Sequence, residues 1–143
     1  MLIQLPLTQV SDHWPFIKDR VAQHYPAIAE KNAPTESILY ALMVGTMQMW
    51  KISDTPSPDS VTRGFILTTI LGDVTDTATL LIYEAIILDK RAKVNPTEDF
   101  ETLKGYAKSR GCTKIGVFLD NEKVLTLLTD GGFSTTTYAS IEI

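Results

Sequence analysis

The chain has 143 residues, 44% of them hydrophobic, which fits one compact domain, 1–143, with a buried core. Thirteen basic and seventeen acidic residues give a net charge of -4 without a long run of either sign, which argues against a non-specific nucleic-acid platform. The single cysteine, Cys112, excludes an internal disulfide and a multi-cysteine zinc site.

Neither the N-terminal stretch nor the longest apolar run has the pattern of an export signal or a membrane span. The stretch 1–7 lacks a positively charged region and is interrupted by Pro6, so it does not have the pattern of a secretory signal. The longest apolar run, near 80–88, contains Glu84 and is far shorter than the roughly 20 residues that a spanning helix needs. We expect a soluble intracellular protein.

The first part of the chain predicts a short extended piece and two helices. The extended piece lies at 3–7, and Ser11 can cap a helix that continues to about residue 25. Thr35 can cap a second helix, which Gly45 ends.

Three β-rich runs follow, at 46–53, 63–71 and 77–88. A polar loop with two prolines, 53–60, separates the first two, and a turn at Gly72 separates the second and third. Short connections of this kind favour an antiparallel meander.

The next helix has a well-marked start. Asn95 can cap it, Pro96 occupies the first helical position, where no N–H is needed, and Glu98 can close a capping box. Gly111 ends it in the left-handed geometry that glycine tolerates, and a strand at 113–119 follows.

The chain closes with a short helix, which Asp120 or Asn121 caps and Gly131-Gly132 stops, and with a final strand at 133–143. A strand-helix-strand unit of this size favours a right-handed crossover between parallel strands. The expected fold is α/β (α+β): a mixed central sheet made of an antiparallel meander and a C-terminal strand-helix-strand unit.

The segment 121–133, in which Asn121 opens a short helix that ends at Gly132-Phe133, resembles the closing motif of the GNAT N-acetyltransferases. The predicted order of helices and strands is similar to that of the same family. The resemblance implies a single GNAT-like domain and, where such a domain is active, transfer of an acetyl group from acetyl-CoA to an amine.

In that family a glycine-rich turn, roughly Arg-Gly-x-Gly-x-Gly, grips the pyrophosphate of acetyl-CoA through its backbone N–H groups. The corresponding residues here are 91–96, and the three glycine positions hold Ala92, Val94 and Pro96. Valine adds β-branched bulk and proline removes one donor outright, so the sequence predicts that no cofactor binds.

An active enzyme remains the alternative, and the resemblance then implies particular contacts with acetyl-CoA. The residues concerned are Arg91, Lys93, Asn95 and Asn121. A basic turn of this kind is more often a solvated edge, which is the interpretation we favour.

The catalytic positions are also altered. Where many family members carry the tyrosine that protonates the departing thiolate, this chain has Leu128, which cannot donate a proton. Tyr83 or Tyr138 could substitute, although their spacing places neither near a thioester, and a half-buried aromatic on a strand is the simpler interpretation of each.

Glu84 is the candidate general base of an active enzyme, because burial in an apolar run would raise its pKa. The competing interpretation, which we favour, is a residue at a sheet edge or bulge that reaches solvent or pairs with Lys or Arg. His13 and His24 lack the companion ligands of a metal site, so none is expected, and Cys112 fits a small buried hydrophobe.

Three short motifs are similar to those of small GNAT-like proteins encoded by tailed bacteriophages. They are Asp-x-Trp-Pro at 12–15, Leu-x-x-Gly-x-x-Gln-x-Trp at 42–50, and Ala-x-x-x-Gly-Cys at 107–112. This resemblance implies a place in the virion or the host cytoplasm, with phage structural proteins or a second copy as partners and with no membrane or specific nucleic acid.

Two functions therefore follow from the sequence. The first is a catalytically degenerate GNAT-like phage protein that serves in the virion or in assembly and needs no cofactor. The second is an acetyl-CoA-dependent N-acetyltransferase with an atypical pyrophosphate loop and Glu84 as its base.

Overall fold

The computed structural model describes the chain apart from residues 27, 31, 58, 90–95 and 120–121. Its elements are β1 (Leu2–Gln4), α1 (Leu7–Gln23), α2 (Thr35–Val44), β2 (Met47–Ser53), β3 (Thr62–Gly72), β4 (Ala78–Ile87), α3 (Pro96–Ser109), β5 (Lys114–Val117) and α4 (Glu122–Asp130). Among these residues no helix combines the length and the apolar character required to cross a bilayer.

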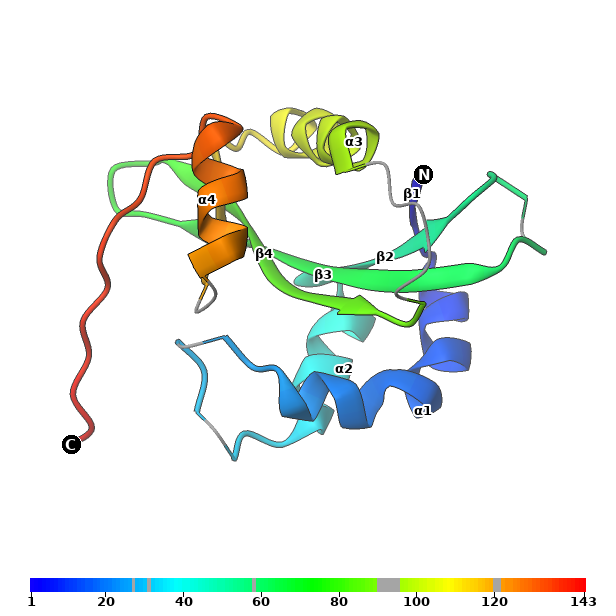
Figure 1. Ribbon diagram of the computed structural model, residues 1–143. Coiled ribbons are helices and arrows are strands. Elements are labelled where there is room, and N and C mark those ends of the chain that lie inside the picture. The colour runs from blue at the N-terminus through cyan, green and yellow to red at the C-terminus, as the bar shows by residue number, and fades with distance from the viewer. Residues whose placement is uncertain (27, 31, 58, 90–95, 120–121) are drawn as a thin grey trace.

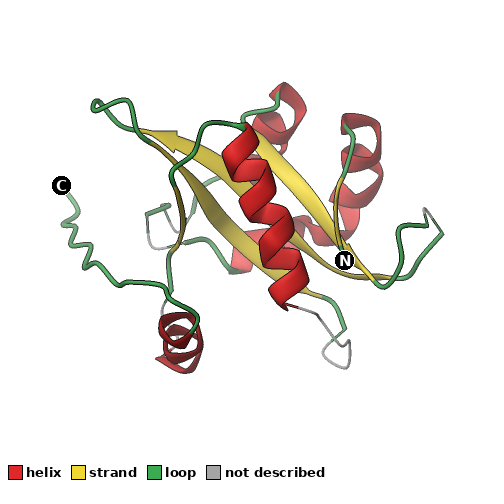
Figure 2. Cartoon of the chain, turned by 90° about the horizontal axis from the view of Figure 1, so that it is seen from above, coloured by secondary structure: helices red, strands yellow, loops and turns green. Residues whose placement is uncertain are grey.

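The described strands form one mixed sheet in the order β1-β2-β3-β4-β5. Neighbours from β1 to β4 are antiparallel, whereas β4 and β5 are parallel and are connected through α3. The predicted meander and mixed sheet are confirmed. Figures 1 and 2 show α1 and α2 on one face of the sheet and α3 across the other.

Each face of the sheet covers its own apolar cluster. The cluster beneath α1 and α2 comprises Leu5, Val10, Trp14, Ile17, Val21, Ile38, Leu42, Met47, Met49, Phe65, Leu67 and Ile86. The cluster beneath α3 comprises Leu2, Trp50, Ile52, Leu80, Leu103, Ala107 and Cys112. Burial on both faces explains why β4 reads as a nearly continuous apolar run rather than as an alternation.

α1 begins at Leu7 with Pro6 at its N-cap, and not with Ser11 as the cap, so the predicted start was five residues late. The Pro6 carbonyl accepts hydrogen bonds from the backbone N–H groups of Gln9 and Val10, which opens the helix without a side-chain cap. The early start is needed because Val10 is part of the buried stripe. α2 (Thr35–Val44) has Pro34 at its N-cap and Thr35 as its first helical residue, so the prediction that Thr35 caps it was wrong. Gly45, as predicted, stops the helix, in a left-handed conformation with a φ of 84°.

α3 and α4 end next to the glycines that the sequence predicted as their stops. Gly111 and Gly132 have φ values of 75° and 94°. After α4, the N–H of Phe133 donates to the Leu128 carbonyl at 2.9 Å, which closes the helix. The described start of α3 at Pro96 also agrees with prediction, although the proposed cap, Asn95, lies outside the described residues.

The final strand at 133–143 is not formed, and this part of the prediction was wrong. These residues have strand-like composition, but a strand also needs an edge to pair with and a surface for its apolar face. Ile141 is 88% exposed in this structure, and the chain beyond α4 runs away from the sheet (Figure 1). The strand-helix-strand unit that the structure contains is β4-α3-β5.

A buried chain of hydrogen bonds links β2 to β3 on the α3 side. The Trp50 indole N–H donates to the Thr68 hydroxyl at 2.9 Å, Thr68 donates to the Gln48 side-chain carbonyl at 3.0 Å, and the Gln48 amide donates to the Gly45 carbonyl at 3.3 Å. The Trp50 ring also meets Tyr106 of α3 edge-on at 5.0 Å. Because Thr68 is fully buried, it is the link that keeps two other polar groups paired.

Replacing Thr68 by valine should therefore destabilise the protein although the two side chains have the same shape. The change leaves the Trp50 N–H and the Gln48 oxygen without their partner, and we expect a loss of about 2–4 kcal/mol in the free energy of unfolding. Thr68→Ser keeps the hydroxyl and should cost only about 1 kcal/mol for its missing methyl group. Equal losses in urea denaturation of the two variants would contradict the role given to this hydroxyl.

Candidate functional site

The candidate site lies where the pairing of β3 and β4 is interrupted. Leu67 pairs with Glu84, but the next residue, Thr68, pairs with Ile82, so Tyr83 is an extra residue on β4. Such a bulge changes which face of the sheet the following side chains occupy. Since Glu84 stands opposite Leu67, it lies on the face covered by α1 and α2.

β5 leaves β4 at the same level. The two strands pair from Thr79 to Ile82, where Val117 is the last partner, whereas β4 continues to Ile87. No strand in the described part of the chain pairs with this edge of β4 beyond Ile82. The bulge and the parting of two parallel strands therefore coincide, and they leave Glu84 next to an unpaired stretch of backbone.

Glu84 is buried without a hydrogen-bond partner. Its side chain is only 5% exposed, and neither carboxylate oxygen is hydrogen bonded within the part of the chain that the structure describes. Burial raises the pKa of Glu84 to about 8, because a charged carboxylate loses its hydration there. A carboxyl group with such a pKa can accept and release a proton near neutral pH, as a general base must.

This corrects the interpretation that the sequence favoured. Glu84 does sit at a bulge, but it neither reaches solvent nor forms an ion pair with a described Lys or Arg. The candidate base of the alternative function is therefore buried and without a hydrogen-bond partner among the described residues.

Two tyrosines lie close enough to Glu84 for its charge to raise the pKa of their phenols. Burial, followed by Glu84, raises the pKa of Tyr25, whose hydroxyl donates to the Ala33 carbonyl at 2.9 Å. Burial also raises the pKa of Tyr83, with smaller contributions from Tyr25 and Glu84. Sequence reasoning missed Tyr25, because it follows α1 and meets β4 only through the packing of two layers, for which no spacing exists.

The predicted cofactor contacts lie outside the residues that the structure describes. They are Arg91, Lys93, Asn95 and Asn121. Leu128, at the position of the missing tyrosine, lies half-buried in α4.

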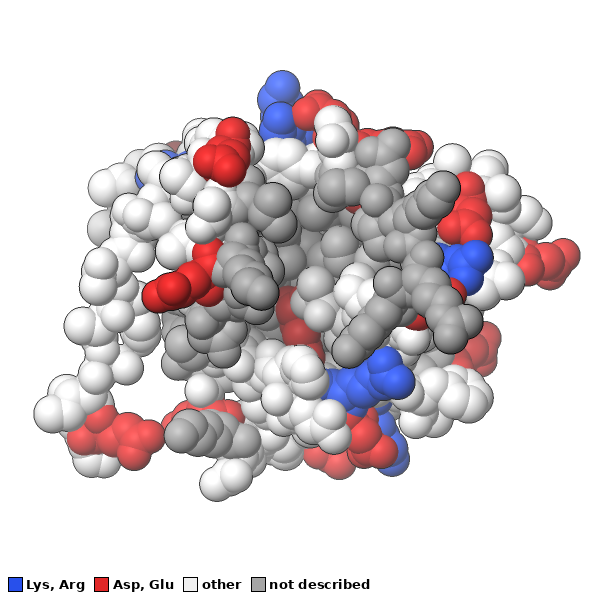
Figure 3. Space-filling view, viewed as in Figure 1, with Lys and Arg blue, Asp and Glu red and all other residues white. Residues whose placement is uncertain are grey.

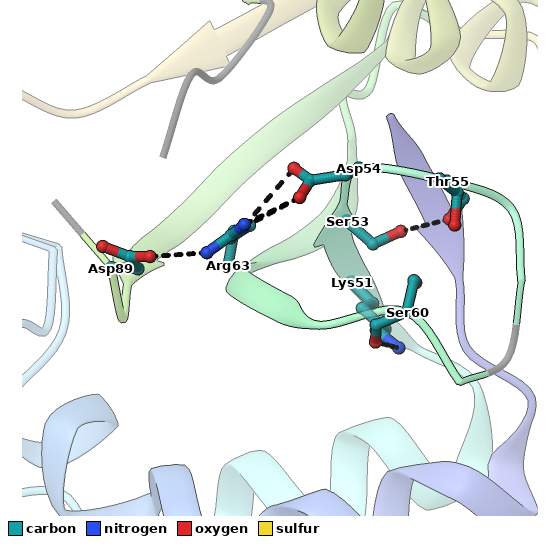
Figure 4. Close-up of polar contacts among 7 residues, drawn as sticks. All are labelled: Lys51, Ser53, Asp54, Thr55, Ser60, Arg63 and Asp89. Carbon is teal, nitrogen blue, oxygen red and sulfur yellow. Dashed lines mark hydrogen bonds and ion pairs between the residues drawn. The ribbon is translucent and has the colours of Figure 1, made fainter. Parts of the chain in front are cut away.

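The end of β4 is held by Arg63, which lies between Asp89 and Asp54 in Figure 4. The Arg63 guanidinium donates to Asp89 at 2.6 Å and to Asp54 at 2.8 Å, and its backbone carbonyl accepts the N–H groups of Leu88 and Asp89. The Arg63 hydrogen bond lowers the pKa of Asp54. One side chain therefore ties the end of β4 to the loop that follows β2.

The remaining candidates have structural surroundings. His13 contacts the Phe65 ring at 5.2 Å, and burial, together with Lys51, lowers the pKa of the imidazole. Cys112 is buried in the cluster under α3, as predicted. Within the described residues no His, Cys, Asp and Glu side chains gather in a group that could hold a metal ion. Figure 3 shows charges of both signs scattered over one face.

No family model matches this chain, and no curated protein matches it by sequence. Solved structures do match over the whole chain. A probable acetyltransferase superposes with a TM-score of 0.70 at 10% identity, covering 100% of this chain and 96% of that one.

Two further matches have TM-scores of 0.65. One is an aminoglycoside N-acetyltransferase in complex with CoA, at 15% identity, and the other is a ribosomal-protein-alanine N-acetyltransferase from Brucella melitensis, at 16% identity. Each covers 100% of this chain and 98% of its own. At these identities the likeness shows the fold, and the chain has the GNAT acetyltransferase fold.

The burial of Glu84 predicts a stability that depends on pH. The carboxyl ionises near 4.5 in the unfolded chain and near 8 in the folded protein, so the native state keeps a proton that the unfolded state has lost. The free energy of unfolding should therefore fall by about 3–5 kcal/mol as the pH rises through this window, and change no further from this source above it.

Glu84→Gln keeps the shape of the side chain and removes the titration. Its free energy of unfolding, measured by urea denaturation across the same pH range, should lack this decline. A decline of equal size in both proteins would assign it to other groups and would contradict a buried, unpaired Glu84.

Proposed function

We propose that this protein is an acetyl-CoA-dependent N-acetyltransferase in which Glu84 is the general base. The observation that carries the proposal is the unpaired, buried carboxyl group at the β4 bulge, where β5 parts from β4. A carboxyl group without a partner costs stability, and the raised pKa that results is the property that proton transfer uses. The fold shared with solved acetyltransferases supports the same assignment.

When bound, acetyl-CoA supplies an acetyl thioester as the acyl donor. Ionised Glu84 would take the proton from an acceptor amine as the amine nitrogen bonds to the acetyl carbon and the bond from that carbon to sulfur breaks. The phenol of Tyr83 neighbours Glu84 and is the side chain that could return a proton to the leaving sulfur. Leu128 cannot do so, and of the two tyrosines that the sequence suggests, Tyr83 and Tyr138, we propose Tyr83 because it adjoins Glu84 whereas Tyr138 packs against Phe118.

The fit of the chain to acetyl-CoA is partial. The unpaired edge of β4 beyond Ile82 leaves backbone groups that no described strand uses, and a pantetheine amide could bond to them. Pro96, in contrast, begins α3 without an N–H and weakens the helix start as a phosphate site. The contacts proposed for the cofactor are Arg91, Lys93, Asn95 and Asn121.

A second function is favoured by the altered positions. Pro96 and Leu128 each remove a group that the acetyl transfer would use, and Ile141 exposes an apolar side chain to water. These features suit a non-catalytic GNAT-like protein that binds partners. Under this proposal the partners are phage structural proteins or a second copy, and the protein resides in the virion or the host cytoplasm.

Calorimetric titration with acetyl-CoA separates the two functions. The enzyme should show saturable binding, and Lys93→Ala should weaken it, because a phosphate contact is removed. Absence of heat at millimolar acetyl-CoA, together with co-sedimentation with phage particles, would contradict the acetyltransferase and favour the second function.

The role of Glu84 has its own test. Glu84→Gln should bind acetyl-CoA as the parent does, yet release CoA thiol roughly 10²–10⁴-fold more slowly with an accepted amine. The parent rate should rise with pH to a plateau above about 8, where the carboxyl is ionised. Glu101→Gln, at an exposed surface pair on α3, is the matched control and should keep the parent rate. Equal rates in all three proteins would exclude Glu84 as the base.

A further inference from the structure

β1 stops before β2 does, which leaves part of the outer edge of the sheet open. β1 ends at Gln4, and the N–H of Leu5 donates one last hydrogen bond to the Met49 carbonyl at 2.9 Å. Pro6 follows and has no N–H to donate, and its carbonyl already accepts two bonds from the first turn of α1. The chain therefore leaves β2, which at this end extends to Met47.

The open edge of β2 has backbone groups but no partner strand. Because Met49 presents its carbonyl to the chain of β1, Met47, two residues before it, presents its own N–H and carbonyl to the same side. Within the described ranges only β1 pairs with this side of β2, and it does not reach Met47. An unpaired strand edge can bind an added extended segment through main-chain hydrogen bonds.

A hollow of about 290 Å³ lies beside this edge, and residues 47–49 of β2 line it. Leu7 of α1 and Leu42 of α2 line it from one face of the sheet, and Tyr106 and Arg110, at the end of α3, line it from the other. Figure 1 shows these helices on opposite faces. The hollow therefore passes around the edge of the sheet, and its volume, at the lower limit of small-ligand sites, suits a short segment.

Arg110 gives the hollow a preference for an anion. Of the described residues that line the hollow, it alone carries a charge. Its guanidinium donates to the Tyr106 hydroxyl at 3.1 Å and lies 5.7 Å from the centre of that ring, but no described carboxylate forms an ion pair with it. The planar fork of N–H donors on a guanidinium matches the two oxygens of a carboxylate.

Apolar side chains form most of the remaining lining. Leu5, Val10, Leu42 and Met47 are buried, whereas Leu7 is 49% exposed although it lines the hollow. A ligand with an apolar side chain would remove part of this surface from water.

We propose that this hollow binds a short extended peptide that ends in a free carboxylate. The carboxylate pairs with Arg110, the peptide amides pair with the open edge of β2, and an apolar last side chain packs on Leu7. The open edge is only roughly 10 Å long, so the carboxylate and the paired amides must lie within two or three residues of each other. The end of a peptide chain meets this requirement with its own backbone.

The proposed peptide site is separate from the candidate site at Glu84. It lies on β2, which β3 separates from β4 in the sheet. The proposal therefore does not depend on acetyl transfer.

Amide chemical shifts of the isotope-labelled full chain, recorded during a titration, measure this binding and locate it. The probe is a pool of N-acetylated tripeptides that end in leucine, valine or phenylalanine with a free carboxylate and contain only alanine and threonine before that residue. We expect saturable shifts at 4–7, 45–49 and 106–110. Because the probe has no free amine, it cannot serve as an acceptor in acetyl transfer.

Matched changes in the ligand and in the protein test the two contacts. The same peptides with a C-terminal carboxamide should bind roughly 10–100-fold more weakly, because they lose the charged hydrogen bonds to the guanidinium. N-methylation of the last amide should also weaken binding, because it removes a donor to β2. Arg110→Gln should lose the preference for the carboxylate, whereas Lys108→Gln, which removes a charge from α3 outside the hollow, should bind as the parent does.

Several results would overturn the proposal. They are the absence of shifts at millimolar peptide, equal affinity for carboxylate and carboxamide, and an Arg110→Gln protein that still prefers the carboxylate. Shifts confined to β4 and Tyr25 would place the peptide at Glu84 instead and would overturn it as well. Each of these results leaves the binding of acetyl-CoA, which is measured separately, undecided.

Discussion

One extra residue in β4 determines how this sheet is used. Before the bulge, Leu80 and Ile82 point to the α3 side, whereas after it Ile86 points to the side of α1 and α2. If β4 alternated regularly and Tyr83 had its own partner on β3, Glu84 would lie on the same face as Ile82, under α3. The insertion therefore carries an ionisable group into the larger apolar cluster, and the same place is where β5 stops following β4.

The two ends of β4 consequently differ in how they pair with their neighbours. From Thr79 to Ile82 it is a central strand that pairs with β3 on one side and with β5 on the other. Beyond the bulge it pairs on one side, and its end is held by Arg63 through both the backbone and the guanidinium. Arg63 therefore anchors the end of β4 next to an edge that no described strand pairs with.

Much of the fold could be predicted because its punctuation is local. Gly45, Gly111 and Gly132 stop their helices through a left-handed conformation that their neighbours cannot adopt as easily, and Pro96 marks a helix start. Glu84 within an apolar run suggested a sheet edge or a bulge, but the face that Glu84 occupies could not be predicted, since β4 is apolar on both faces and its sequence has no alternation whose phase could change. The approach of Tyr25 to Glu84 depends on packing between layers and leaves no trace in spacing.

The final strand shows the opposite limit. Its residues alternate as a strand should, yet local pattern fixes only the backbone that a segment prefers, and pairing depends on which edge lies within reach.

The proposed cofactor contacts and Glu84 bear on different quantities, which is why the altered turn does not decide the function by itself. Replacing glycines in a phosphate turn weakens binding of the donor, an effect on affinity that a high donor concentration can offset. In the proposed mechanism Glu84 would act on the rate of the chemical step, whereas a protein that only binds partners would have no use for its proton transfer. In such a protein Glu84 would lower the stability of the fold without serving binding, because glutamine or leucine would fill the same space without burying an ionisable group. The chemistry of β4 thus argues for catalysis more directly than the turn argues against it.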